Sequence, residues 1–141
     1  NAAQEAARTG VAVVTTIHSN SCEATYRRMV SLCKRAVDMS DETLLSYVTE
    51  AYPIVAFCKQ LENRERRLME IQECEIRPDG TRSYRPLFQY KITENRVEDG
   101  KFIIEGRHEQ VHTISDGLAK RLLENGMPGE ALKQLRGGVN V

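Results

Sequence analysis

The order of apolar and polar positions divides the chain into an opening α/β segment, a central β segment and a closing helical segment. The opening segment contains a continuous apolar run at residues 11–14, Val-Ala-Val-Val, which predicts a strand buried on both faces of a parallel sheet. The strand end, where open α/β sheets place their ligands, carries the polar residues Thr15, Thr16, His18, Ser19 and Asn20. Ser21 is a good N-cap. This segment therefore predicts a strand, a polar tip and a helix.

Helical periodicity predicts two helices after the tip. In residues 21–37 the apolar positions recur every three or four residues, at Tyr26, Met29, Val30, Cys33 and Val37. Ser40 can cap a second helix, which Pro53 closes. The apolar face of this second helix consists of Leu44, Leu45, Val48, Ala51 and Tyr52. Each helix is therefore expected to bury one side.

The central segment predicts strands joined by tight turns. The expected strands cover residues 54–61, residues 67–76, a stretch in which Phe88, Tyr90 and Ile92 alternate onto one face, and residues 101–104. Pro78-Asp79-Gly80 favours a reversal, because proline fixes φ and glycine permits positive φ. Asp99-Gly100 predicts a second turn. We expect these strands to form an antiparallel addition to the core sheet.

The closing segment is helical. From Thr113 the apolar residues lie four positions apart, at Ile114, Leu118 and Leu122. Gly126 is placed to stop this helix, and Pro128 can open a last short one. The whole pattern predicts an α/β fold.

Composition limits the class of protein. The chain has 141 residues, enough for one domain with a core, and 20 basic residues balance 20 acidic ones. A balanced charge does not favour nucleic acid as a partner, and no apolar run approaches membrane-spanning length. The four cysteines, Cys22, Cys33, Cys58 and Cys74, show no paired motif and predict reduced packing thiols in a cytoplasmic protein.

One motif resembles that of a known family. Thr9-Gly10, four further residues and then Thr15-Thr16-Ile17-His18-Ser19-Asn20-Ser21 are similar to the histidine box of the secretion and pilus-assembly ATPases, whose usual form is Thr-Gly-His-x-x-x-[Ser/Thr]-Thr-[Ile/Leu]-His-[Ala/Thr]-Asn-Ser. The likeness is greatest to the branch of type IV and tight-adherence pili. Val11 stands where many members have a first histidine, whereas His18 matches the second.

The resemblance implies a fold and a parent enzyme. Residues 1–64 would be the C-terminal portion of a RecA-like P-loop NTPase core, residues 65–110 an added antiparallel β segment, and residues 111–141 the C-terminal helices. The parent would be a homohexameric motor at the cytoplasmic face of the cell membrane. It would use ATP and Mg²⁺ to drive pilus assembly or protein export, and it would act on an integral-membrane platform protein.

The resemblance also implies site residues. His18 would sense the γ-phosphate of ATP from the strand tip, with Thr16 and Asn20 orienting its ring. Arg28 occupies the place of a family arginine ten residues after the box histidine. It would either reach the nucleotide of a neighbouring subunit or lie solvated on its helix.

The phosphate-binding loop of such an enzyme is not found in the sequence. That loop has the form G-x-x-x-x-G-K-[ST], and the only Gly-Lys pair, Gly100-Lys101, lacks the earlier glycine. In the family the loop and the acidic metal-binding segment precede the Thr-Gly. We therefore expect the chain to be a piece of a longer motor that neither hydrolyses ATP nor binds it tightly alone, since phosphoryl transfer depends on both elements.

Two alternatives from other classes remain open. His108-Glu109-Gln110-Val111-His112 fits the H-E-x-x-H signature of zinc hydrolases, with Glu124 or Glu130 as a third ligand. The stretch lies between an expected strand and an expected helix, which disfavours the single helical face that this chemistry needs. The second alternative is an interaction module. It would self-associate, as a dimer, through an open apolar edge at residues 11–14.

Overall fold

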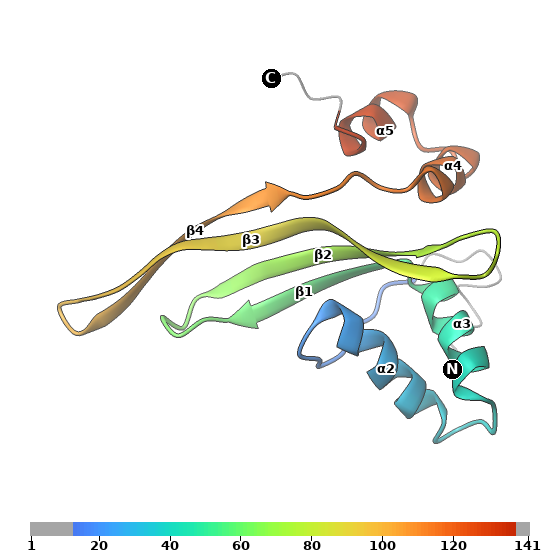
Figure 1. The fold of residues 1–141 in the computed structure, drawn as a ribbon, viewed down its shortest axis with the longest axis horizontal. Helices are drawn as coiled ribbons and strands as arrows, with labels where there is room; N and C mark the ends of the chain where they lie inside the picture. Colours follow the sequence, from blue (N-terminus) through green and yellow to red (C-terminus); the bar gives the residue numbers. More distant parts are fainter. Residues whose placement is uncertain (1–12, 138–141) are drawn as a thin grey trace.

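The structure is a computed structural model that describes residues 13–137. Thr9 and Gly10 of the histidine-box motif and the first half of the apolar run at 11–14 lie outside the described residues. Within them the fold is mixed α/β, as the sequence predicts. Four strands form one sheet, and helices pack on both of its faces (Figure 1).

The sheet is an antiparallel meander in the order β1-β2-β3-β4. Its strands are β1 (Ile54–Gln60), β2 (Arg66–Ile76), β3 (Arg82–Glu98) and β4 (Lys101–Gln110). Both predicted turns are present, with positive φ of 84° at Gly80 and 74° at Gly100. Each strand pairs with the next in sequence, so that every connection within the sheet is a hairpin.

The predicted helices form close to their expected positions. They are α2 (Cys22–Cys33), α3 (Asp41–Ala51), α4 (Asp116–Glu124) and α5 (Gly129–Leu135). Ser21, Ser40 and Ser115 cap the first three, because the side-chain oxygen of each accepts a backbone N–H of the first turn. Gly126 follows α4 with a φ of 91°, as expected of a helix stop.

The larger core lies between one face of the sheet and the helices α2 and α3. It consists of Tyr26, Met29, Val30, Cys33, Leu44, Val48, Tyr52 and Cys74. The Tyr26 hydroxyl is buried and donates a hydrogen bond of 2.6 Å to the backbone carbonyl of Tyr52. This bond ties α2 to the end of α3, so that the two helices pack on the sheet as a unit.

A smaller core lies on the opposite face, under α4 and α5 (Figure 1). Its buried residues are Leu87, Ile114 and Ala119. Between Ile114 and Ala119 the N-cap Ser115 contacts the carboxylate of Glu73, which is only 2% exposed on β2. The sheet is thus covered on both faces at the end away from the β3–β4 turn.

One expectation about the sheet is wrong. Val13 and Val14 do not form a strand, and Val14 is 95% exposed. A strand buried on both faces needs partner strands on either side, whereas the described sheet is built from consecutive hairpins that begin at β1. Val13 instead packs against the larger core from an irregular segment. Among residues 13–137, no helix is long and apolar enough to cross a membrane.

Candidate functional site

The polar tip is fixed at the N-terminal end of α2. The Ser21 hydroxyl accepts the backbone N–H of Ala24 at 3.0 Å, and the Ser21 carbonyl accepts the Thr25 hydroxyl at 2.9 Å. The Ser19 hydroxyl donates to the same carbonyl at 3.2 Å. The first of these bonds satisfies an N–H group that a helix start leaves open. The other two fasten the Ser19 and Thr25 side chains to the Ser21 carbonyl and so help to fix the residues before the helix.

The first residue of α2 fastens the helix to the sheet. The buried thiol of Cys22 donates to the carbonyl of Val55 on β1 at 3.6 Å, and it lies 3.9 Å from the carbonyl of Glu70 on β2. Burial, helped by the nearby charge of Glu70, raises the pKa of Cys22 to about 12. The group therefore stays a neutral thiol at physiological pH, a packing and donor group rather than a nucleophile.

A shallow, open hollow of about 460 Å³ lies between the tip and α2. It is lined by His18, Ser19, Asn20, Ala24 and Arg28. Ala24 and Arg28 share one face of the helix because they are four residues apart. The structure thus brings together three of the four predicted site residues, His18, Asn20 and Arg28, and all three are exposed to solvent.

Thr16, the fourth predicted residue, lies along a different hollow. This one measures about 690 Å³ and runs between residues 13–19 and the segment that ends α3 and forms β1. His18 and Ser19 line both hollows, whereas Thr16 lines only the second. His18 therefore stands at the boundary, with Asn20 and Arg28 on one side and Thr16 on the other.

The first hollow is suited to an anionic group. It opens beside the N-terminus of α2, where the helix dipole favours negative charge, although Ser21 already accepts the Ala24 N–H and Glu23 lies in the first turn. Arg27 forms an ion pair with Glu23 at 2.8 Å, whereas Arg28 has no ion-pair partner among residues 13–137. The Arg28 guanidinium is thus available to a ligand, and such groups bind phosphate or carboxylate with two parallel hydrogen bonds.

Sequence reasoning missed two residues that line this hollow, Ser19 and Ala24. Ser19 belongs to the same polar tip and could have been found from its position. The small side chain of Ala24 leaves space for the hollow. Its place could have been recognised from the sequence, because Ala24 lies four residues before Arg28 and therefore on the same face of the helix.

The H-E-x-x-H stretch does not form the face that zinc chemistry requires. His108 lies in β4, and its Nε2 is 2.9 Å from the carbonyl oxygen of Leu68. His112 lies between β4 and α4, with Nδ1 3.0 Å from the carbonyl oxygen of Pro86. Four residues of extended chain span about 13 Å, too far for one ion to bind both rings. No cluster of three or more potential ligands occurs among residues 13–137.

No model of a protein family matches this chain, and no curated protein sequence matches it. Any function assigned to the chain therefore depends on the motif at residues 9–21 and on the geometry of the hollow.

Proposed function

We propose that this chain is part of a motor ATPase that drives protein export or pilus assembly, with His18 responding to the γ-phosphate of ATP. The observation that carries the proposal is the hollow in which His18, Asn20 and Arg28 meet at the start of α2. These are residues for which the histidine-box resemblance implies a role.

The chemistry of the hollow supports a phosphate as its ligand. The imidazole of His18 and the amide of Asn20 are hydrogen-bond donors, and Arg28 adds a positive charge. The N-terminal end of α2 adds a partial positive charge at the same place. A terminal phosphate carries the acceptors and the negative charge that match this set, whereas an apolar ligand would leave the donors unpaired.

The attachments of α2 explain how a phosphate signal would reach the rest of the domain. When hydrolysis releases the phosphate, His18 loses an acceptor, and the tip that bears it is joined to α2 through Ser21. Cys22 then links α2 to β1. Loss of one contact at the tip would therefore move a helix and a strand, which is a common basis of nucleotide switching.

The remaining machinery belongs to the proposed parent protein. ATP and Mg²⁺ would be held by a phosphate-binding loop and an acidic segment that precede residue 9 in the longer chain. The parent would be a homohexamer at the cytoplasmic face of the cell membrane and would act on an integral-membrane platform protein. Arg28 is exposed on α2 and could reach the nucleotide of a neighbouring subunit.

The first test is to read the coding sequence upstream of this chain and then to assay the encoded protein. We expect a phosphate-binding loop followed by an acidic motif. In that protein His18→Ala should lower kcat about tenfold or more without lowering the melting temperature. The matched control is His112→Ala, which removes another exposed imidazole far from the hollow. Turnover that is unchanged in His18→Ala would contradict the proposed role.

Arg28 needs a separate experiment because its two implied roles differ. If Arg28 serves a neighbouring subunit, Arg28→Ala should lower turnover only under conditions in which the ring assembles. The control is Arg27→Ala, since Arg27 is the adjacent residue and is paired with Glu23. An equal loss for both variants would indicate that Arg28 acts only as a solvated charge on the helix.

A further inference from the structure

The β3–β4 hairpin projects beyond the helices that cover the rest of the sheet (Figure 1). In the described part of the chain β4 is an edge strand, because its one partner in the sheet is β3. The outward-facing N–H and C=O groups of an edge strand are free to pair with another strand. The projecting part of β4 is therefore a place where a second chain could add to the sheet.

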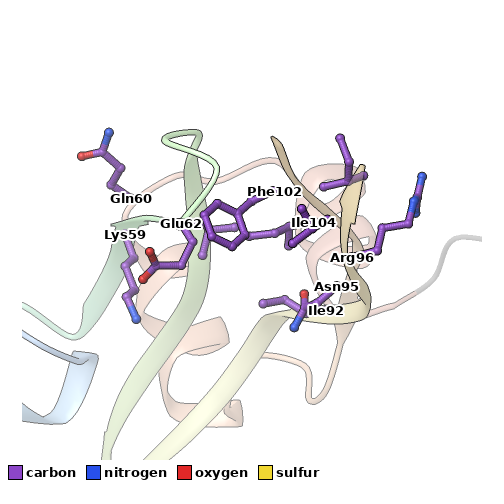
Figure 2. A pocket seen from close by; sticks show the side chains of 11 residues that line it. Lys59, Gln60, Glu62, Ile92, Asn95, Arg96, Phe102 and Ile104 are labelled. Atoms are coloured by element: carbon purple, nitrogen blue, oxygen red, sulfur yellow. The ribbon is translucent and has the colours of Figure 1, made fainter. Parts of the chain in front are cut away.

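The same hairpin exposes apolar side chains. Val97 is 66% exposed and its cross-strand partner Phe102 is 56% exposed. Figure 2 shows Phe102 and Ile104 in a groove between the β1–β2 turn at Glu62 and the β3 strand. This groove has a volume of about 550 Å³. Edge strands usually avoid such apolar exposure, since it favours association.

The sequence of the edge is complementary to itself. Residues 101–105 read Lys-Phe-Ile-Ile-Glu. In an antiparallel pairing of two copies centred on Ile103, Lys101 lies opposite Glu105 of the partner subunit, and Phe102 lies opposite Ile104 of the partner subunit. Both pairs occur twice. Opposite charges and apolar side chains directly across an antiparallel pair are the combinations that stabilise it.

Neighbouring registers are less favourable. Centring the pair on Ile104 places Lys101 opposite Arg107 of the partner subunit, and centring it on Glu105 places that carboxylate opposite its own copy. Like charges directly across a strand pair destabilise it. If one strand slipped by a single residue, the apolar side chains of the two copies would lie on opposite faces of the joined sheet and could not cover one another. The pairing centred on Ile103 is the one that satisfies both the charges and the apolar residues.

We propose that this chain forms a dimer in which the β4 strands of two copies pair antiparallel about Ile103. The two sheets then join edge to edge, and the Phe102 and Ile104 side chains of both copies cover one another beside the groove. The Glu105 carboxylate also forms an ion pair of 3.1 Å with Arg96 on the adjacent strand β3. Lys101 has no ion-pair partner within residues 13–137 and is available to the partner subunit. This interface does not depend on the function proposed above.

Charge reversal tests the pairing without altering its apolar residues. The 141-residue chain is studied by sedimentation velocity over a range of concentrations, as Lys101→Glu, as Glu105→Lys and as an equimolar mixture of the two. Each variant alone places like charges opposite one another twice. Its dimer should therefore dissociate about tenfold more readily, or more, than that of the original chain. In the mixture every such pair is again of opposite charge, and heterodimers should form with nearly the original affinity.

The control is Lys120→Glu, an exposed reversal on α4 that should leave the dimer intact. Circular dichroism of each variant confirms that it is folded, and successful pairing in the mixture shows directly that both variants retain β4. Three results would overturn the proposal: a monomeric original chain, single variants that dimerise as it does, or a mixture that stays monomeric. Dimers insensitive to both reversals would point to another interface, such as one through β1, the opposite edge strand of the described sheet.

Discussion

Glu73 on β2 accepts two hydrogen bonds from Ser115, one from the backbone N–H at 2.9 Å and one from the hydroxyl. Ser115 is also the N-cap of α4, because its oxygen accepts the N–H of Leu118 at 3.1 Å. Both Glu73 and Ser115 are buried. A single carboxylate therefore fixes the start of α4 on the face of the sheet opposite to α2 and α3.

Removal of this carboxylate should weaken the attachment of α4. We expect Glu73→Ala to lower the free energy of unfolding by roughly 3 kcal/mol, since it leaves a buried N–H without an acceptor and opens a cavity. Glu73→Gln keeps the shape and one acceptor oxygen, so its cost should be smaller. Urea denaturation measures both. The control is Glu62→Ala, an exposed change that should cost close to nothing, and an equal effect of the two alanine variants would contradict the role of Glu73.

The hydrogen bond from Tyr26 to the carbonyl of Tyr52 should stabilise the larger core. Tyr26→Phe keeps the ring, which lies 5.7 Å from that of Tyr84 between centroids, and removes only the donor. The buried carbonyl then loses its partner, which should cost about 1 kcal/mol or somewhat more of unfolding free energy. Tyr84→Phe, which removes the hydroxyl of the neighbouring ring, serves for comparison. A Tyr26→Phe protein as stable as the original would show that water replaces the lost donor.

The helices and turns were predictable because their signals are local. Ser21 and Ser40 precede apolar stripes with helical spacing, and both prove to be N-caps. Gly80 and Gly100 mark the two turns because each has positive φ. Capping and turn chemistry act within a few residues, so they can be recognised without knowledge of the rest of the fold.

Features that depend on distant residues were not predictable. The apolar run at 11–14 favours a buried strand, but Val13 and Val14 lie in an irregular segment, because burial in a sheet depends on which strands are neighbours. Glu73 has no local sign of burial, since its partner Ser115 lies 42 residues away. In the site, Arg28 lines the same hollow as Ala24 because the two residues lie one helical turn apart. Residues 16–20 form no regular secondary structure, so no sequence periodicity could predict that Thr16 and Asn20 would line different hollows.

Alkaline pH should destabilise the fold through its buried thiols. Burial raises the pKa of Cys22 from 9.0 to about 12 and that of Cys74 from 9.0 to about 11. The unfolded chain therefore loses these protons first, and the folded chain holds more protons in this range. This contribution to stability is fully present below about pH 9, and it is lost progressively as pH rises from there through the folded pKa values of about 11 and about 12. Urea denaturation midpoints measured from pH 8 to 11 should show this fall. The fall should be smaller in Cys22→Ala. If the midpoint depended on pH equally in Cys22→Ala and in the original chain, the raised pKa of Cys22 would not be its cause.

The same burial predicts which thiols react. The four cysteines lie within the described residues as thiols, and only Cys58 is exposed. At neutral pH a thiol reagent should label one cysteine per folded chain rapidly, and the other three only after unfolding. Cys58→Ser should abolish the rapid phase. Rapid labelling that persists in this variant would show that the start of α2 or the larger core opens readily.

Gly106 lies at the middle of β4, where its backbone packs closely against β3. A Cβ atom there would lie 2.5 Å from the backbone carbonyl oxygen of Lys91 and 2.7 Å from the ring of Tyr90. The Lys91 carbonyl belongs to the backbone of β3 and cannot move without disturbing the sheet. Gly106→Ala should therefore push β4 away from β3 and lower the free energy of unfolding by roughly 1–3 kcal/mol. Gly117→Ala is a control that should raise stability instead of lowering it. Its new Cβ would lie 3.8 Å from the Ser115 hydroxyl oxygen in the first turn of α4, and alanine favours helix over glycine by about 0.5–1 kcal/mol. If both variants shifted thermal stability in the same direction, the close packing of Tyr90 over Gly106 would not be what selects glycine at this position.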